Sequence, residues 1–563
     1  MRFNQRIEIF NLARVILLFL WIYAWGNCVN PLSIECFSYP EESDHIQHFL
    51  GWISYAYDDN SNLIPPTFSS WTWPYDSQLL FADTIPLLSI IFKPIIQLFN
   101  IKFHYFSLIS LINILLIFNC VVKIGDYFNL RKIDTSILGF LLAFSPIAIL
   151  RIYAGHESLS LHILIVYPLM LIITRNSNIW KWLIIYLAAL GIHAYFIPII
   201  ALLNIYELWS SFIEKGYAIN PKYRKLIAFI LLIILGGVLF GYVPNSFSAS
   251  KNGVLWSANV LALIDPQITS LIFPGIQNIP IIQWEGYSYL GLIGIFLIAI
   301  TIFMWSRKIE LIKVFPSQSF LLILTVFIFI IAIGNPIYFM DIELSKTNYI
   351  LNLLGSYKYI FRATGRLMWP IYYILMIWSF INVSSYLRKR SNIHRIFIIF
   401  SIFLLLESHM YLTIKVNALM NKRSLLGLEY IKRQSNNDIS FLIKENKYLI
   451  NATGNPYFRT KDLPAYMIHS TNPKMKTNYL PRFARENIRF IKNYSLSQCQ
   501  ILDLIYKKIP NNELSKSIFI LQDDITPKCN NKYKKILNLQ EPGFSIYKIK
   551  DYGAFQTNLD DAA

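Results

Sequence analysis

Residues 15–25 read VILLFLWIYAW, an apolar run that follows Arg2, Arg6 and Arg14. Similar runs recur along the chain, of whose 563 residues 55% are hydrophobic. A helix of roughly 20 apolar residues crosses the hydrocarbon core of a bilayer. The chain is therefore expected to be a polytopic α-helical membrane protein. Its first segment is expected to be a retained anchor, because no small-residue cleavage site follows it.

The distribution of basic residues orients the expected helices. Arginines before the first segment place the N-terminus in the cytoplasm. Residues 82–99 are expected to form a helix at the outer interface, because Lys93 and Pro94 interrupt the apolar run. With that assignment every inner loop is basic and eleven spans are predicted: Val15–Trp25, Phe103–Val122, Thr135–Leu150, Leu159–Ile173, Trp182–Phe196, Ile197–Trp209, Leu226–Val243, Ser288–Trp305, Phe320–Ile333, Leu367–Leu387 and Ile396–Leu412.

The first outer loop, residues 30–102, is acidic in a chain whose formal net charge is +18. Between Asn30 and Phe92 it holds eight carboxylates and no Lys or Arg. A loop without basic residues is typical of the side facing away from the cytoplasm. Its densest part is EESDHIQH, residues 41–48, where carboxylates and imidazoles crowd together. Such a group is suited to general-base chemistry or to metal binding, although a solvated acidic loop is the simpler reading.

The composition changes after Thr413. Residues 1–413 are expected to form the transmembrane domain, and residues 414–563 a soluble, mixed α/β domain outside the cytoplasm. Cysteines fit this topology: Cys28 and Cys36 are able to pair at the outer surface, and so are Cys499 and Cys529 if the last domain is exported. The basic excess indicates cytoplasmic loops and anionic lipid. Nucleic acid is not an expected partner, because the sequence shows no basic-aromatic RNA-binding motif and no phosphate-cradling glycine loop.

Further ionisable groups are predicted on the outer side of the expected spans, where they are functional candidates. His156 and Glu157 precede the fourth span, and Glu285 precedes the eighth. Arg362 and Arg366 precede the tenth, four residues apart and so on one face of a helix. Two guanidiniums on one face match a phosphate. The alternatives are arginines that snorkel to lipid headgroups and, for Glu285, a cap at the start of a helix.

Acids and an arginine pair on one membrane face suggest sugar transfer from a lipid-phosphate donor. A carboxylate would take the proton of the acceptor hydroxyl as its oxygen attacks the anomeric carbon. Cations, from arginine or a metal, would stabilise the departing phosphate.

At these positions the sequence resembles the GT-C class of membrane glycosyltransferases. It is similar in kind to serotype-converting O-antigen glucosyltransferases, and closer to a bacterial GT-C-like family. The resemblance covers short motifs in order along most of the chain: Asp44 with His48, Asp83 to Pro94, His156 with Leu159, Glu285-Gly286-Tyr287 with Tyr289-Leu290-Gly291, Phe361-Arg362 with Gly365-Arg366, and Asn478-Tyr479-Leu480 with Arg482-Phe483.

The resemblance implies a polyprenyl-phosphate-sugar donor and inverting transfer to a glycan acceptor, such as an envelope polysaccharide or O-antigen, at the bacterial inner (plasma) membrane. The predicted general base is Asp44, with Asp83 second. The predicted residues that bind the donor phosphate are Arg362, Arg366 and Lys93. Those expected to position the acceptor or a metal are Glu42, His45, His48, His156, Glu157 and Glu285. A divalent cation, Mg²⁺ or Mn²⁺, stays an open expectation because Glu42-Ser43-Asp44 is only near an Asp-x-Asp motif.

Three other readings remain open. An O-antigen polymerase is polytopic too, but it would be expected to rely on arginine-rich outer loops. A transporter or flippase of lipid-linked glycans needs polar groups through the bilayer midplane. A membrane O-acyltransferase needs a histidine near the membrane, which His156, His162 or His193 would supply.

Overall fold

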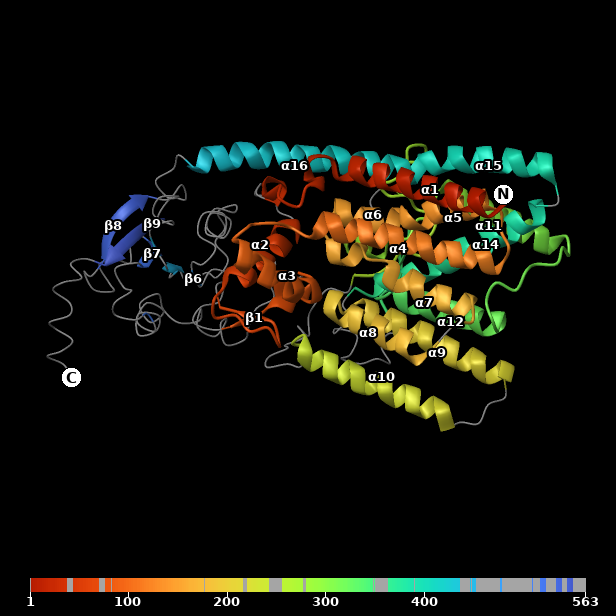
Figure 1. Ribbon diagram of the computed structural model, residues 1–563, viewed down its shortest axis with the longest axis horizontal. Helices are drawn as coiled ribbons and strands as arrows, with labels where there is room; N and C mark the ends of the chain where they lie inside the picture. The colour runs from red at the N-terminus through yellow and green to blue at the C-terminus, as the bar shows by residue number, and fades with distance from the viewer. Residues whose placement is uncertain are drawn as a thin grey trace. The chain divides into compact units, whose positions relative to one another are not determined.

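The computed structural model describes most of the first 435 residues and short stretches of the rest. These are residues 2–37, 44–69, 76–82, 84–176, 178–215, 220–242, 256–276, 280–347, 349, 363–388, 390–435, 446, 448–451, 476–477, 509, 517–522, 533–538 and 544–549. Over these residues the chain is mostly helical, with few strands (Figure 1). It divides into two units: unit 1 is residues 1–29, 105–236 and 249–420, and unit 2 is residues 30–104, 237–248 and 421–563.

Unit 1 contains nearly all of the long apolar helices. They are α1 (Arg2–Trp25), α4 (Phe106–Tyr127), α5 (Lys132–Ala143), α6 (Pro146–Tyr153), α7 (Ile163–Ile173), α8 (Ile179–Ile192), α9 (Phe196–Lys215), α10 (Asn220–Leu239), α11 (Gly291–Ser306), α12 (Gln318–Ala332), α14 (Met368–Leu387) and α15 (Ser391–Leu405). Short 3₁₀ turns η4 (Glu157–Ser160), η5 (Ile281–Gly286) and η7 (Thr364–Leu367) lie at the starts of helices or between them. A hairpin of β3 (Ile337–Phe339) and β4 (Ile342–Ser345) follows α12.

Among the described residues, six helical stretches are long and apolar enough to cross a membrane, by length and composition. They are Glu8–Val29, Phe106–Tyr127, Lys132–Tyr153, Phe196–Ile213, Thr364–Leu387 and Asn392–Glu429. Six of the eleven expected spans fall on them. The other five overlap shorter apolar helices, as does the expected interfacial segment. The chain is a helical protein suited to a membrane, which the apolar runs predicted.

The last long helix extends further than the sequence suggested. From α15 the chain passes through a π-helical turn, η8 (Leu406–Met410), into α16 (Tyr411–Ser435), and Figure 1 shows the three in line. The expected boundary at residue 413 therefore lies inside a helix. Lys415, Lys422 and Arg423 lower the hydropathy there, but lysine and arginine are good helix formers, so the helix continues.

The core of unit 1 forms where α4 packs against α5 and α7, and α11 against α14. Polar side chains join these helices. Asn113 of α4 donates to the carbonyl of Ser160 (3.3 Å) and accepts from the amide of Ile163 (2.9 Å). The Arg14 guanidinium of α1 donates to Asn119 of α4 (3.0 Å). These hydrogen bonds between helices offset the cost of burying polar side chains in an otherwise apolar interior.

Unit 2 contains the acidic loop and the described part of the C-terminal region. The loop folds into η2 (Ile34–Phe37), α2 (Asp44–Tyr57), a small hairpin of β1 (Thr67–Phe68) and β2 (Ser77–Gln78), η3 (Leu79–Ala82) and α3 (Pro86–Phe99). The indole of Trp52 in α2 is fully buried and donates to the carbonyl of Phe103 (2.8 Å). The acidic stretch is thus largely a folded structure, not only a solvated loop.

The C-terminal strands form one mixed sheet in the order β6-β5-β7-β9-β8. Its members are β5 (Tyr448–Asn451), β6 (Lys476–Thr477), β7 (Ser517–Gln522), β8 (Tyr533–Asn538) and β9 (Phe544–Ile549). The pairs β5–β6 and β5–β7 are parallel, and β7–β9 and β8–β9 are antiparallel. Cys499, Cys529 and the motif at 478–483 lie outside the described residues. Cys28 and Cys36 are each disulfide-bonded.

Candidate functional site

A completely buried arginine lies in the last turn of the apolar helix α6. The stretch 132–153 is interrupted at Ser145, after which Pro146 occupies the first turn of α6, where its missing N–H costs nothing. Arg151 follows in this second helix and has 0% of its surface exposed. A buried guanidinium needs a counter-charge, because its transfer out of water is otherwise very costly.

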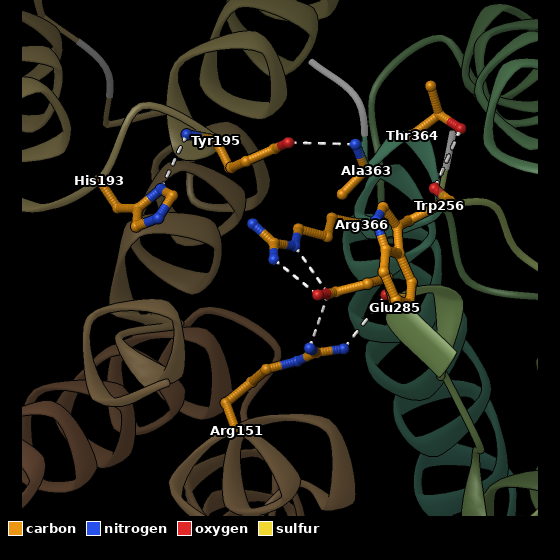
Figure 2. Close-up of polar contacts among 8 residues, drawn as sticks. All are labelled: Arg151, His193, Tyr195, Trp256, Glu285, Ala363, Thr364 and Arg366. Atoms are coloured by element: carbon orange, nitrogen blue, oxygen red, sulfur yellow. Dashed lines mark hydrogen bonds and ion pairs between the residues drawn. The ribbon is translucent and has the colours of Figure 1, made fainter. Parts of the chain in front are cut away.

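Glu285 supplies that counter-charge and shares it with a second arginine (Figure 2). Arg151 Nη1 lies 2.8 Å from Glu285 Oε2, and Arg151 Nη2 donates to the Glu285 carbonyl at 3.1 Å. Arg366 binds the same carboxylate through two nitrogens, with Nε 2.9 Å from Oε2 and Nη2 2.9 Å from Oε1. We refer to Arg151, Glu285 and Arg366 as the Arg–Glu–Arg cluster. Glu285 is only 8% and Arg366 7% exposed.

Two glycines bring Glu285 and Arg366 together. Each charged residue is next to a glycine in sequence, Gly286 in η5 and Gly365 in η7. A Cβ added to Gly365 would lie 2.7 Å from the Cα of Gly286, too close for any side chain. The amide of Gly365 also donates to the carbonyl of Trp256 (3.1 Å). The close approach of these two backbones therefore fixes the carboxylate opposite the guanidinium.

Aromatic rings cover the guanidiniums. The Arg151 Cζ lies 4.6 Å from the ring centre of Trp284 and 5.2 Å from that of Trp369. The Arg366 Cζ lies 4.1 Å from the ring of Tyr195, whose hydroxyl accepts from the Ala363 amide (3.0 Å). Rings over cations stabilise the charge and exclude water from it. The cluster is thus a charged group in a place of low polarity, where electrostatic effects are strong.

The electrostatics keep Glu285 ionised. Burial raises the pKa of this carboxyl, but the charges of Arg366 and Arg151 outweigh the burial and hold the pKa well below its usual range. The charged groups that act on Arg151 are Glu285 and Arg366. With two guanidiniums and one carboxylate, the three residues together carry one positive charge.

The two predicted residues before the fourth span lie close to this cluster. The half-buried ring of His156 is centred 6.0 Å from that of Trp284, and its charge acts on Glu285. Glu157 is buried and begins η4. His162, at the start of α7, is fully buried and makes a 2.8 Å hydrogen bond through Nδ1 with the hydroxyl of Tyr373. His193 accepts from the amide of Tyr195 through its own Nδ1 (3.2 Å).

The predicted residues of the acidic loop belong to unit 2. Asp44 is the first residue of α2, and its side chain lies outside the described part. His45 and His48 are both buried on α2, and the ring of His45 stacks on Phe37 with 4.1 Å between centroids. Glu42, Asp83 and Arg362 also lie outside the described residues.

Lys93 has a structural partner that the sequence did not reveal. The residue is 5% exposed, and its ammonium donates to the carbonyls of Tyr55 (3.2 Å) and Asp58 (3.3 Å), at the C-terminal end of α2. It also lies 4.6 Å from the Tyr55 ring centre. Burial lowers the pKa of Lys93, an effect that the charges of Asp58 and Asp59 oppose. An ammonium at this end of a helix satisfies orphan carbonyls and complements the helix dipole.

A second buried ionic group in unit 1 involves α5, α14 and α15. His394 Nε2 lies 2.9 Å from Asp134 Oδ1, and Ser384 donates to Asp134 Oδ2 (2.7 Å). Arg131 Nη1 lies 2.8 Å from His394 Nδ1. We refer to Asp134, His394, Ser384 and Arg131 as the Asp–His cluster. It joins the starts of α5 and α15 to the end of α14.

A third buried acid, Glu407, lies in the π-helical turn η8. It is 2% exposed. Its carboxylate accepts from the Tyr289 hydroxyl (3.2 Å), the Leu292 amide (3.3 Å) and the Ser270 hydroxyl. Single π-turns inside helices occur often at functional sites. Over the described part of the chain, no group of three or more His, Cys, Asp or Glu side chains is placed to hold a metal ion.

Sequence reasoning singled out Glu285 and Arg366 separately and did not include Arg151. The pair is 81 residues apart in sequence, and no periodicity links two turns that far apart. A signal for Arg151 did exist, since an arginine inside the apolar run PIAILRIY is a candidate for a buried partner of an acid.

Comparison with known proteins identifies the family of the chain but does not assign an activity to it. No curated protein and no solved structure matches the chain. A model of one protein family, described as a domain of unknown function (DUF6311), matches residues 12–406. This range includes all of the described helices from α4 to α14, and with them both buried ionic clusters. The chain therefore belongs to the DUF6311 family.

Proposed function

We propose that this protein is a GT-C-type membrane glycosyltransferase that transfers a sugar from a polyprenyl-phosphate donor to an extracytoplasmic glycan, such as an envelope polysaccharide or O-antigen. The observation that supports this most is the Arg–Glu–Arg cluster. It gathers two guanidiniums and aromatic rings next to apolar helices, where a lipid-linked phosphate would have to bind. Guanidiniums suit phosphate because their paired N–H groups match its oxygens.

The proposed reaction is a single inverting displacement. The carboxylate of Asp44, supported by Asp83, takes the proton of the acceptor hydroxyl while that oxygen bonds to the anomeric carbon of the sugar. The bond from the anomeric carbon to the phosphate oxygen breaks, and the polyprenyl phosphate leaves with the electron pair. Arg366 and Arg362 stabilise the negative charge that develops on it. Lys93 is left out of this role, because its ammonium already binds two carbonyls of α2.

The proposed topology completes this picture. Eleven spans place the N-terminus in the cytoplasm of a bacterium, with the acidic loop and the C-terminal region outside its plasma membrane. The outer position of the loop agrees with its lack of basic residues. It also agrees with the disulfide-bonded Cys28 and Cys36, since disulfides persist in oxidising compartments. His156, Glu157 and Glu285 are proposed to line the donor side, with a divalent cation left as an option for the acidic loop.

The test is a comparison of envelope glycans from cells with and without the protein, by sugar composition and linkage analysis. A sugar residue present only with the intact protein is expected, and Asp44→Asn is expected to lower transfer by roughly 10²- to 10⁴-fold. Asp59→Asn, a neighbouring exposed acid of the same loop, is the matched control and should keep transfer. Unchanged glycans in all arms, or full transfer by Asp44→Asn in a correctly inserted protein, would contradict the proposal.

Transport of a lipid-linked glycan is the second candidate, and Glu407 favours it. This acid is buried in the apolar stretch Asn392–Glu429, and its described partners are hydroxyls and an amide, without a cation. Ionisable groups inside membrane helices often mark transport pathways. Accumulation of an unmodified lipid-linked glycan on one leaflet in cells without the protein would support this second function.

A further inference from the structure

The Arg–Glu–Arg cluster has more hydrogen-bond donors than acceptors. Arg151 is fully buried, yet its Nε has no hydrogen-bond partner among the described residues. An arginine nitrogen is always a donor, so this N–H lacks an acceptor. Buried polar groups are almost always satisfied in proteins, and an exception indicates a ligand, an ion or a water molecule.

Two further buried nitrogens near Arg151 also lack a hydrogen-bond partner among the described residues. The indole Nε1 of Trp369 and the Nε2 of His162 have no partner in the described part of the chain, and both side chains have 0% exposure. The ring of Trp369 lies 5.2 Å from the Arg151 Cζ and 4.8 Å from the ring of His162. Because His162 Nδ1 is paired with the Tyr373 hydroxyl, the tautomer in which it accepts leaves Nε2 as a donor. Three unpaired donors around a guanidinium suit a ligand rich in oxygen acceptors.

The carboxylate of Glu285 already binds the guanidiniums as a phosphate would. Its two oxygens receive three N–H bonds of 2.8 to 2.9 Å from Arg151 and Arg366. A phosphodiester offers two free oxygens and one negative charge, as a carboxylate does, whereas a phosphomonoester offers three free oxygens and more charge. The two guanidiniums together carry two positive charges, which equals the charge of a phosphomonoester dianion and exceeds that of the one carboxylate they now share.

We infer that Glu285 is a resident anion that occupies the donor-phosphate site until a phosphate displaces it from Arg151 and Arg366. The ligand class is a phosphomonoester or phosphodiester, and Arg151 is a further residue that binds it. This inference rests on the proposed function, whose donor carries such a phosphate. Glu285 then controls loading of the site: it neutralises the arginines in the empty protein and competes with every incoming anion.

The test measures thermal unfolding of the full-length protein in detergent, in inorganic phosphate and in chloride at equal ionic strength. In chloride, Glu285→Gln is expected to have a lower midpoint than the wild type, because two buried guanidiniums lose their counter-charge. Phosphate is expected to restore the midpoint of this variant. Its apparent affinity should be about tenfold or more tighter than for the wild type, because the carboxylate of Glu285 no longer competes and a factor of ten corresponds to only about 1.4 kcal/mol. Asp134→Asn removes the buried carboxylate of the Asp–His cluster and is the matched control, which should keep the weaker phosphate response of the wild type.

Further measurements distinguish a lipid-linked phosphate from a free phosphate, and further variants keep the test decisive if Glu285→Gln does not fold. Farnesyl phosphate in micelles should stabilise Glu285→Gln at lower concentration than inorganic phosphate if the ligand is lipid-linked, and equal potency would assign a free phosphate. Glu285→Asp keeps the charge on a shorter side chain and should have an affinity between those of the wild type and Glu285→Gln. Arg151→Lys in the Glu285→Asp background should remove the response.

Two results would overturn the inference: an equal phosphate response in Glu285→Gln, Asp134→Asn and the wild type, or no response in either Glu285 variant. These results are separate from the glycan analysis. A phosphate response without sugar transfer would support the role of Glu285 as a resident anion and would contradict the proposed glycosyltransferase activity. Sugar transfer without a phosphate response would reject only the role of Glu285.

Discussion

The Arg–Glu–Arg cluster and the Asp–His cluster are both buried in unit 1, but they differ in charge balance. In the Asp–His cluster each group has a matching partner. Arg131 is always a donor, so His394 Nδ1 accepts from it and Nε2 carries the proton toward Asp134. A neutral imidazole thus lies between one cation and one anion. In the Arg–Glu–Arg cluster two guanidiniums share one carboxylate, and Arg151 Nε has no hydrogen-bond partner among the described residues.

The difference teaches which buried ions hold helices together and which are arranged for a ligand. The Asp–His cluster pairs one acid with an imidazole and a hydroxyl, and its contribution is to the arrangement of α5, α14 and α15. A cluster with a surplus of positive charge under aromatic rings is able to bind an anion. Three changes test the contrast, in order of decreasing effect.

Arg151→Met should have the largest effect on stability. The change leaves Glu285 with one guanidinium instead of two and removes the cation from between Trp284 and Trp369. Breaking a buried ion pair from one side costs about 3–5 kcal/mol. Denaturant unfolding in detergent measures this, with Arg307→Met as control, because Arg307 is exposed and its removal should cost little. A cost below 1 kcal/mol would mean that Arg366 alone satisfies Glu285.

His394→Met should have an intermediate effect, and on stability alone. Asp134 keeps the Ser384 hydroxyl but loses the imidazole N–H, and an unsatisfied buried acceptor costs about 1–3 kcal/mol. Unfolding in detergent and the phosphate response are both measured on the same variant. A changed phosphate response would show that the two clusters are coupled and would remove the contrast between them.

The smallest effect concerns pH. The pKa of Glu285 is lowered in the folded protein, so the stability that its charge contributes is present above its unfolded pKa, about 4.3, and is lost as the pH falls through the lower folded value. The difference in unfolding free energy between the wild type and Glu285→Gln should therefore stay constant from about pH 8 to pH 5 and shrink only in stronger acid. A difference that already decreases near pH 6 would show that Glu285 is not held ionised by its arginines.

The helices were largely predictable and the cluster was not, for physical reasons. A backbone in hydrocarbon must satisfy its own hydrogen bonds, so apolar runs of bilayer length predict helices with little ambiguity. The end of the last helix was missed because hydropathy falls after Leu412 while helix propensity does not. Glu285 and Arg366 stood out as ionisable groups near expected spans, but their contact depends on the approach of Gly286 and Gly365 in three dimensions. The partners of Lys93 were not predictable either, because every residue has a backbone carbonyl and the sequence does not show which of them accept a hydrogen bond.

The contact of Lys93 with the end of α2 limits how the length of this region can vary. Lys93 is seven residues beyond Pro86, the first residue of α3, so its direction depends on how many residues come before it in that helix. Insertion of one residue there would turn the ammonium by about 100° away from the carbonyls of Tyr55 and Asp58, and insertion of four would move it by about 6 Å along the helix axis. Related chains should therefore keep the first two turns of α3 constant in length.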